Sequence, residues 1–239
     1  MTPPAAQLAH LRTQNGWEEL SDLCERQLGF ISSNQVVSRP HLRRSLEHAL
    51  FTGRLSKWEE IAGITIFREP SAGGDFAAED YYPSLLAAVG HLMVDSAVPP
   101  AVLAGNSALY IWNCGVVTPD SMSLSIRQDL LTDELENHIS TIPHCTIADP
   151  VPTRTGLQAW SIHNEIPVES VPAALLREAA DPGMEPQWIL SAAQDAYSLG
   201  LASIEELTHS LEPLAQRLQW VNSHDAIAEV LQHSSLHLV

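Results

Sequence analysis

The stretch Gly29-Phe-Ile-Ser-Ser-Asn-Gln-Val-Val-Ser38 and the residues after it, Arg39-Pro-His-Leu-Arg-Arg-Ser-Leu-Glu-His-Ala-Leu50, decide how the N-terminal part of the chain folds. Ser32 or Ser33 can cap a short helix over residues 34–37, and Ser38 can cap a longer helix that continues to Gly53. The longer helix carries one apolar stripe at helical spacing: Leu42, Leu46, Ala49 and Leu50. Its charged and histidine side chains fall outside that stripe, so the sequence predicts an amphipathic helix with a basic outer face.

A further helix precedes this segment, and a hairpin follows it. Before Gly29, five apolar residues recur at helical spacing: Trp17, Leu20, Leu23, Cys24 and Leu28. Residues 55–58 and 64–67 are rich in β-prone side chains, and we expect residues 59–63 to turn between them. This order, a helix, a short helix, a basic helix and a hairpin, is that of a winged helix-turn-helix. In that fold the second helix of the helix-turn-helix pair enters the DNA major groove. We therefore expect residues 1–70 to form a winged helix-turn-helix DNA-binding domain.

The net charge of -17 at first argues against nucleic-acid binding, because phosphate contacts need Lys and Arg. The distribution changes that conclusion. Residues 1–70 hold eight basic and eight acidic residues, whereas residues 71–239 hold four and twenty-one. Five of the twelve basic residues lie within positions 39–57, against one acid, Glu47. The whole-chain charge therefore hides a local basic patch, although a solvated helix face without function accounts for a cluster of this size equally well.

The candidate DNA contacts come from this patch. Arg39 and His41 lie in the first turn of the basic helix, the part of a recognition helix that usually meets base edges. Arg43 and Arg44 project away from the apolar stripe. Arg54 and Lys57 flank the hairpin, so we expect them to contact phosphate.

The remainder reads as a separate acidic α/β domain over residues 76–239, with a helical C-terminal half, after a linker at 69–75. The whole chain is thus expected to be α+β. Helices are expected over 81–92, 101–112, 130–139 and 171–180, with Ser170 capping the last. Strands are expected at 122–126, 145–148 and 157–162. Ser203 and Glu206 form a capping box, and Pro213 is expected to kink or split the helix that follows.

Few residues have the spacing of a catalytic or metal site. Gly105-Asn-Ser-Ala-Leu109 resembles a nucleophile elbow but lacks the second glycine and falls in a predicted helix. His144 and Cys145 are neighbours in a predicted strand, so their side chains should point to opposite faces. His233 and His237 have metal-ligand spacing but lie in the C-terminal tail. There is one lysine, Lys57, and no phosphate-binding loop. We expect no catalytic site, no cofactor and no metal ion.

Location is indicated only by absences. No run of about 18 apolar residues is present, so no transmembrane helix is expected. The N-terminal residues lack the basic and apolar regions of a secretory signal. Three cysteines are too few and too far apart for a disulfide framework. We expect a reduced, cytoplasmic protein with no membrane partner.

The segments at 29–38, Leu42-Arg-Arg-Ser-Leu46, Gly53-Arg-Leu55 and Ile64-Thr-Ile-Phe67 resemble the N-terminal winged helix of AbiEi-type antitoxins, of the abortive-infection, type IV toxin–antitoxin class. The later segments 103–115, 166–176 and 192–211 are also similar to that family in order and spacing. Two features depart from the family pattern: Glu59 and Glu60 make the hairpin less basic, and the second domain is strongly acidic.

The resemblance implies a transcriptional autorepressor that binds double-stranded DNA at an inverted repeat upstream of its own operon. It also implies an antitoxin that opposes a co-encoded, nucleotidyltransferase-like toxin without needing a stable complex. The residues themselves leave an alternative open. In it, the first helices are a protein-interaction adaptor that does not bind DNA, either alone or attached to an unrecognised enzyme domain.

Overall fold

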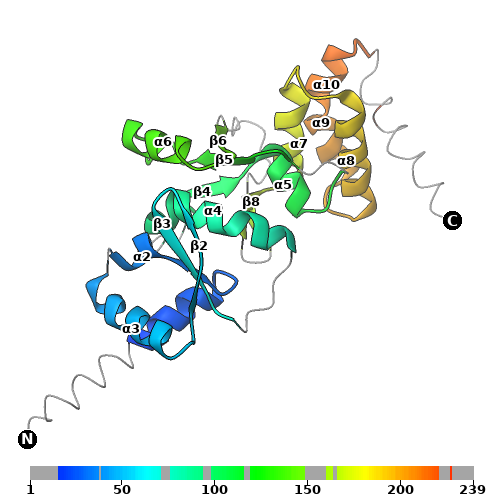
Figure 1. Cartoon of the computed structure of the whole chain (residues 1–239). Helices are drawn as coiled ribbons and strands as arrows, with labels where there is room; N and C mark the ends of the chain where they lie inside the picture. The colour runs from blue at the N-terminus through cyan, green and yellow to red at the C-terminus, as the bar shows by residue number, and fades with distance from the viewer. Residues whose placement is uncertain are drawn as a thin grey trace, which may run out of the picture. The chain divides into compact units, whose positions relative to one another are not determined.

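The computed structural model describes residues 16–37, 39–70, 76–93, 98–115, 119–148, 160–163, 166–220 and 227, and it shows a mixed α+β structure with two sheets (Figure 1). The chain divides into two compact units. The first comprises Met1–Pro100, Leu130–Cys145 and Asn164–Ile166, and the second comprises Ala101–Asp129, Thr146–His163 and Pro167–Val239. This division groups residues 76–93 with the N-terminal elements, whereas the sequence predicts a boundary at 70–76.

The first unit begins with helical residues 16–25 and then alternates helices with short strands. Its further elements are β1 (Phe30–Ser32), α2 (Ser33–Val37), α3 (Pro40–Phe51), β2 (Ser56–Ile61), β3 (Ile64–Arg68), α4 (Phe76–Met93) and α6 (Asp133–Ser140). The three strands form an antiparallel sheet in the order β1-β3-β2. Helices 16–25, α2 and α3 share one apolar core with Ile31 and Phe67 of the sheet.

Two features of this sheet differ from the sequence prediction. Strand β1 was not predicted, because its hydrogen-bonding partner is β3, more than thirty residues away (Phe30 pairs with Arg68), and no local pattern marks it. The hairpin turn is also shorter than expected. It consists of Ala62 and Gly63, which both have positive φ (48° and 79°), as two-residue hairpin turns of type I′ require. Residues 59–61 therefore belong to β2 and not to the turn.

Helix α4 packs against this sheet and against α2. Tyr82 of α4 stacks on Phe30 with ring centroids 6.4 Å apart. At Gly90, α4 lies so close to the end of β1 and the start of α2 that a Cβ atom there would be 2.7 Å from Ser32 Oγ and 3.2 Å from Asn34 Oδ1. Beneath this contact, the buried Gln35 side chain donates to Gln27 Oε1 (2.7 Å) and accepts from the Ser32 amide (3.0 Å). These contacts explain why α4 groups with the first unit.

The second unit contains a five-stranded sheet followed by helices. Its strands are β4 (Ala101–Leu103), β5 (Met122–Ile126), β6 (Cys145–Ala148), β7 (Trp160–His163) and β8 (Ile166–Glu169), in the order β6-β5-β4-β8-β7. Strand β4 runs antiparallel to β5 and parallel to β8. Its helices are α5 (Gly105–Ile111), α7 (Val171–Ala180), α8 (Pro186–Ser198), α9 (Ile204–Ser210) and α10 (Glu212–Arg217).

Several predictions for this region are confirmed. Strand β5 alternates buried and half-buried residues, α7 has the predicted bounds, and the capping box joins Ser203 to Glu206. The chain divides between α9 and α10, where Pro213 lies in the first turn of α10. Ser170 does occupy the N-cap position of α7, but its side chain makes no capping hydrogen bond. Ser38, predicted to cap α3, lies outside the described residues, and Arg39 is the N-cap there.

The predicted helix over 101–112 is confirmed for Gly105–Ile111 and wrong for the residues before Gly105. Residues 101–103 form β4, and α5 begins only at Gly105. A short apolar run is compatible with a buried strand as well as with a buried helix. Here the partners β5 and β8 select the strand, and the positive φ of Gly105 (53°) makes the turn into the helix.

Candidate nucleic-acid interface

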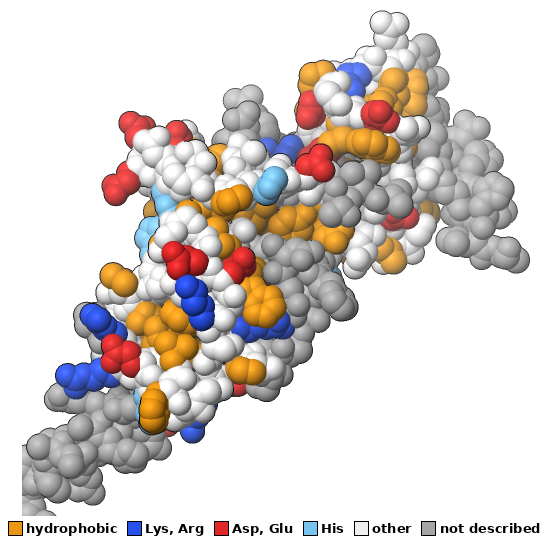
Figure 2. Space-filling view, in the orientation of Figure 1, with side chains coloured by type: hydrophobic (Ala, Val, Ile, Leu, Met, Phe, Trp, Pro, Cys, Tyr) orange, Lys and Arg blue, Asp and Glu red, His pale blue; other side chains and the backbone are white. Residues whose placement is uncertain are grey.

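The outward face of α3 carries the candidate interface. Leu42, Leu46 and Ala49 are buried on the inner face. Opposite them lies a row of exposed side chains spaced three or four residues apart: His41, Arg44, His48 and Phe51. We call this row the α3 outer stripe. At about 100° per residue, Arg44 and Phe51 point most directly away from the core. Figure 2 shows Lys and Arg side chains gathered over α3 together with an acidic one.

The side chains of Arg44 and His48 make no hydrogen bond or ion pair with the described residues, so their donors face solvent. Arg43 lies beside the stripe with its side chain 78% exposed, and it pairs with Glu47 one turn later (3.3 Å). Such exposed pairs contribute about 0–1 kcal/mol, so a phosphate can replace the carboxylate at little cost.

Arg39 does not lie on this surface. Its side chain is only 21% exposed and forms an ion pair with Glu19 of the first helix. The second oxygen of Glu19 is 2.9 Å from Nε2 of His41. One carboxylate therefore joins helix 16–25 to the first turn of α3, and Arg39 supports the helix pair and does not extend toward solvent.

The two remaining predicted contacts lie after α3. Arg54 places its guanidinium 4.7 Å from the ring centroid of Trp17. Lys57 lies on β2 and pairs with Glu60 (2.9 Å). Partial burial raises the pKa of the neighbouring Glu59 carboxyl. The hairpin thus offers one lysine beside two carboxylates, which makes it a weak phosphate-binding element.

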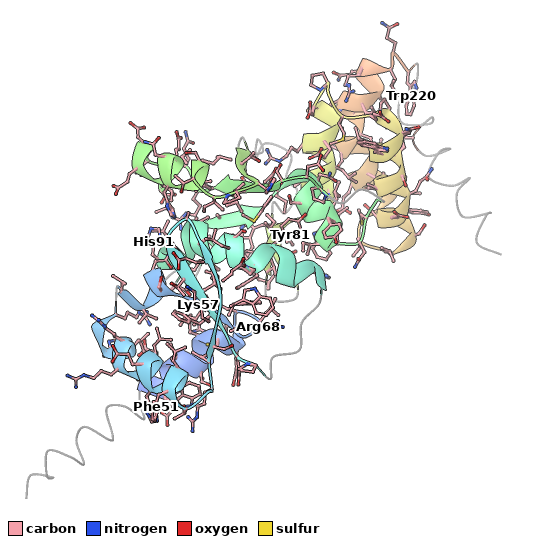
Figure 3. All side chains as sticks on the ribbon, in the orientation of Figure 1. Phe51, Lys57, Arg68, Tyr81, His91 and Trp220 are labelled. Carbon is pink, nitrogen blue, oxygen red and sulfur yellow. The ribbon has the colours of Figure 1, made fainter. Side chains whose placement is uncertain are left out.

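Sequence reasoning missed three residues of this region. Figure 3 labels Phe51 at the end of α3 and Arg68 near Lys57 on the sheet. The helical spacing already places His48 outside the apolar stripe, although it is not among the predicted contacts, and extending that spacing from Arg44 also gives Phe51. Arg68 could not be found in this way, because its guanidinium stacks between Phe30 and Trp58, 5.1 and 4.6 Å from their ring centroids, on strands that only the fold brings together.

The charge of the first unit limits what this surface can do. The unit holds eight basic and sixteen acidic residues, a net charge of -8, and the second unit holds four and thirteen, a net charge of -9. Residues 71–100 and 130–145 bring many acids into the first unit. Any attraction for phosphate is therefore local to α3 and does not come from the unit as a whole.

In the second unit, Ser107 lies in the first turn of α5, so it is inside a helix as expected, but this helix directly follows a strand-to-helix turn, which was not expected. Ser107 is nevertheless fully buried. Its hydroxyl donates to the Ser121 carbonyl (3.2 Å) and accepts from the Ser123 amide (3.0 Å), so it joins α5 to the start of β5 and is not an exposed nucleophile. The Cys145 thiol is also unsuited to catalysis, because burial raises its pKa to about 12.

Two buried carboxylates bind the first backbone amides of α5. Glu169 accepts from the Gly105 amide (2.9 Å), and Glu178 accepts from the Asn106 amide (2.8 Å). Arg177 pairs with Glu169, with Nε 3.2 Å from Oε2. Burial raises the pKa of Glu178. A side chain at position 105 would collide with this network, since its Cβ would lie 2.2 Å from Glu178 Oε1. The network holds α5, β8 and α7 together.

No family model matches the chain, and no curated protein matches its sequence. The resemblance to AbiEi-type antitoxins therefore stays a prediction. Among the described residues, no group of three or more His, Cys, Asp or Glu is arranged to hold a metal ion, and His233 and His237 lie outside them. None of the described helices has the length and apolar character needed to cross a membrane.

Stability measurements should separate the inward arginine from the outward one. Arg39→Ala breaks a partly buried, charge-assisted contact and should lower the free energy of unfolding by about 1–2 kcal/mol. Arg44→Ala, at an exposed position without partners among the described residues, should change it by less than about 0.5 kcal/mol. Urea unfolding of the two variants checks this. Glu19→Gln should cost about as much as Arg39→Ala, and equal stability of both arginine variants would contradict the assignment.

Neutralising Glu169 and neutralising Glu178 should have different effects on the free energy of unfolding. Glu169→Gln leaves the nearly buried Arg177 without its carboxylate and should lower the free energy of unfolding by about 3 kcal/mol. Glu178→Gln keeps an acceptor for the Asn106 amide and removes a carboxylate whose charge is disfavoured by burial. It should therefore be nearly neutral or stabilising at neutral pH.

The pH dependence follows from the raised pKa of Glu178. The folded state binds this proton more tightly than the unfolded chain does, so the contribution to stability is present below the unfolded pKa and is lost as pH rises through the folded pKa. Relative to the wild type, Glu178→Gln should gain stability as pH rises from the ordinary glutamate pKa of about 4.3 through the raised pKa of Glu178. If the difference in unfolding free energy between Glu178→Gln and the wild type did not change with pH, the pKa of Glu178 would not be raised.

Proposed function

We propose that the chain is a DNA-binding transcriptional autorepressor whose residues 16–68 act as a winged helix-turn-helix. In this proposal α3 is the recognition helix, and the β2–β3 hairpin is the wing. The observation that carries it is the α3 outer stripe, in which Arg44 and His48 present free donors on the face opposite the core. The order of elements, with the sheet in the order β1-β3-β2, supports it.

The dimensions of α3 suit a major groove. Twelve residues give a helix about 18 Å long, which spans about five base pairs. Arginine is the side chain that most often recognises guanine, through its O6 and N7 acceptors. Arg44 fits that role, while Arg43, Arg54 and Lys57 lie at its sides, where phosphate contacts position a protein on the duplex.

The acids around this surface predict weak, salt-sensitive binding. Arg43 and Lys57 each give up a carboxylate partner when they take a phosphate. The net charge of -8 on the first unit opposes approach outside the patch. Two linked copies on an inverted repeat, which the family resemblance implies, would compensate by binding two half-sites together.

Mobility-shift assays on the DNA upstream of the chain's own gene test this proposal. Arg43→Ala combined with Arg44→Ala should weaken binding by at least about tenfold, since one base-contacting arginine contributes about 1–3 kcal/mol. Lys57→Ala should weaken all duplexes alike and reduce the salt slope by about one. Arg127→Ala, an exposed arginine of the second unit, is the matched control and should bind as the wild type does. Wild-type binding by the double variant would exclude α3 as the recognition helix.

The antitoxin part of the proposal is carried by the resemblance in order and spacing of segments. It assigns the second unit to opposing a co-encoded, nucleotidyltransferase-like toxin. That unit has a net charge of -9, so a role away from DNA suits it.

Growth rescue tests the antitoxin role separately from DNA binding. The neighbouring gene is expressed in a host in which it arrests growth, and the full chain is then supplied. The wild type and the Arg43→Ala/Arg44→Ala variant should restore growth equally, because the toxin is opposed without operator binding. A neighbouring gene that is harmless by itself, or a double variant that fails to rescue, would contradict this role.

A further inference from the structure

Phe51 is the last residue of α3 and is 89% exposed, the largest exposed fraction among the described large apolar side chains. An apolar ring in water is unfavourable unless a partner covers it. On the helix, Phe51 and Arg44 lie about 20° apart, both nearly opposite the buried residues Leu42 and Leu46. The ring thus points in the same direction as the arginine to which the proposed function assigns base recognition.

The neighbours of Phe51 do not form an apolar patch. His48 and Arg44 precede it on the same stripe, one and two turns earlier, and both present free donors. The exposed Glu47, which pairs with Arg43, also lies one turn before Phe51, beside the stripe. Val37, at the end of α2, is the other strongly exposed apolar residue of α2 and α3. It comes before the first residue of α3, so about 18 Å of helix separates it from Phe51. The core of a protein–protein interface is apolar and depleted in charge, and this surface has neither property.

A row of nitrogen donors that ends in one apolar ring has a counterpart in the major groove. Base edges there present acceptors to arginine and one apolar group, the 5-methyl of thymine. We propose that Phe51 is a specificity-determining residue that packs its ring against a thymine methyl. Arg44 and Phe51 are seven residues apart, about 10 Å along the helix, so the guanine and the thymine lie about three base pairs apart. This inference rests on the proposed function.

The test removes the methyl group from the DNA and the ring from the protein. Duplexes that bind the full-length wild type are selected from a randomised pool, and each thymine is replaced singly by deoxyuridine, which keeps the hydrogen-bonding edges and lacks only the methyl. Replacing one particular thymine by deoxyuridine should lower the affinity of the wild type about 3- to 10-fold, which is the effect of one lost apolar contact. Phe51→Ala should show the same loss on the thymine duplex and no further loss on deoxyuridine.

Trp58→Ala is the control, since Trp58 is an exposed aromatic side chain of the same unit (46%) that packs on Phe30, away from the stripe. It should keep the thymine-to-deoxyuridine difference, as should Arg44→Ala. Because Phe51 is exposed, Phe51→Ala should unfold as the wild type does, so a loss of binding is not a loss of fold. A wild type indifferent to deoxyuridine, or a Phe51→Ala protein that remains sensitive to it, overturns the role of Phe51 alone. A wild type that selects no duplex overturns the proposed function itself. The exposed ring of Phe51 would then be a contact for a protein partner.

Discussion

The pairing of β1 with β3 is the constraint on which the first unit depends. It joins Phe30–Ser32 to residues 66–68, and a further hydrogen bond runs from the Glu69 amide to the Gly29 carbonyl (2.8 Å). Between these paired ends the chain must form α2, α3 and the hairpin within a closed loop of about forty residues. Ile31 and Phe67 then face the helices, while Phe30 faces α4. The outward direction of α3 is therefore set by a strand of three residues.

Local patterns predicted the helices and hairpin well, because capping residues and apolar periodicity act within a few positions. They failed where the deciding partner is distant in sequence. The strand at Phe30–Ser32 and the strand at Ala101–Leu103 both acquire their conformation from strands tens of residues away. The same limit applies to the candidate site. The helical spacing shows that Arg44 points outward, but only the fold shows that Glu19 holds Arg39 inward.

Most cations of the candidate surface already have a partner within the protein. Of the six predicted contacts, Arg39, His41, Arg43 and Lys57 have a carboxylate neighbour, and Arg54 lies over an indole ring. Arg44 is left free among the described residues. Such a surface gives little affinity for DNA, because each paired cation must exchange a carboxylate partner for a phosphate. It can still distinguish between DNA sequences. Any selectivity then rests on the few groups that gain a partner only in the complex.

The packing of α4 has a consequence for how the N-terminal part can be isolated. Phe30 and Ile66 are completely buried, and α4 supplies the side chains over this face of the sheet, including Tyr82. A fragment that stops before α4 would expose a flat apolar surface with a neighbouring strand edge, the combination that promotes self-association. Its precipitation would result from the truncation and would not be a property of residues 16–68 themselves. A fragment intended to work in isolation must therefore extend through α4, whose close approach at Gly90 fits it to α2.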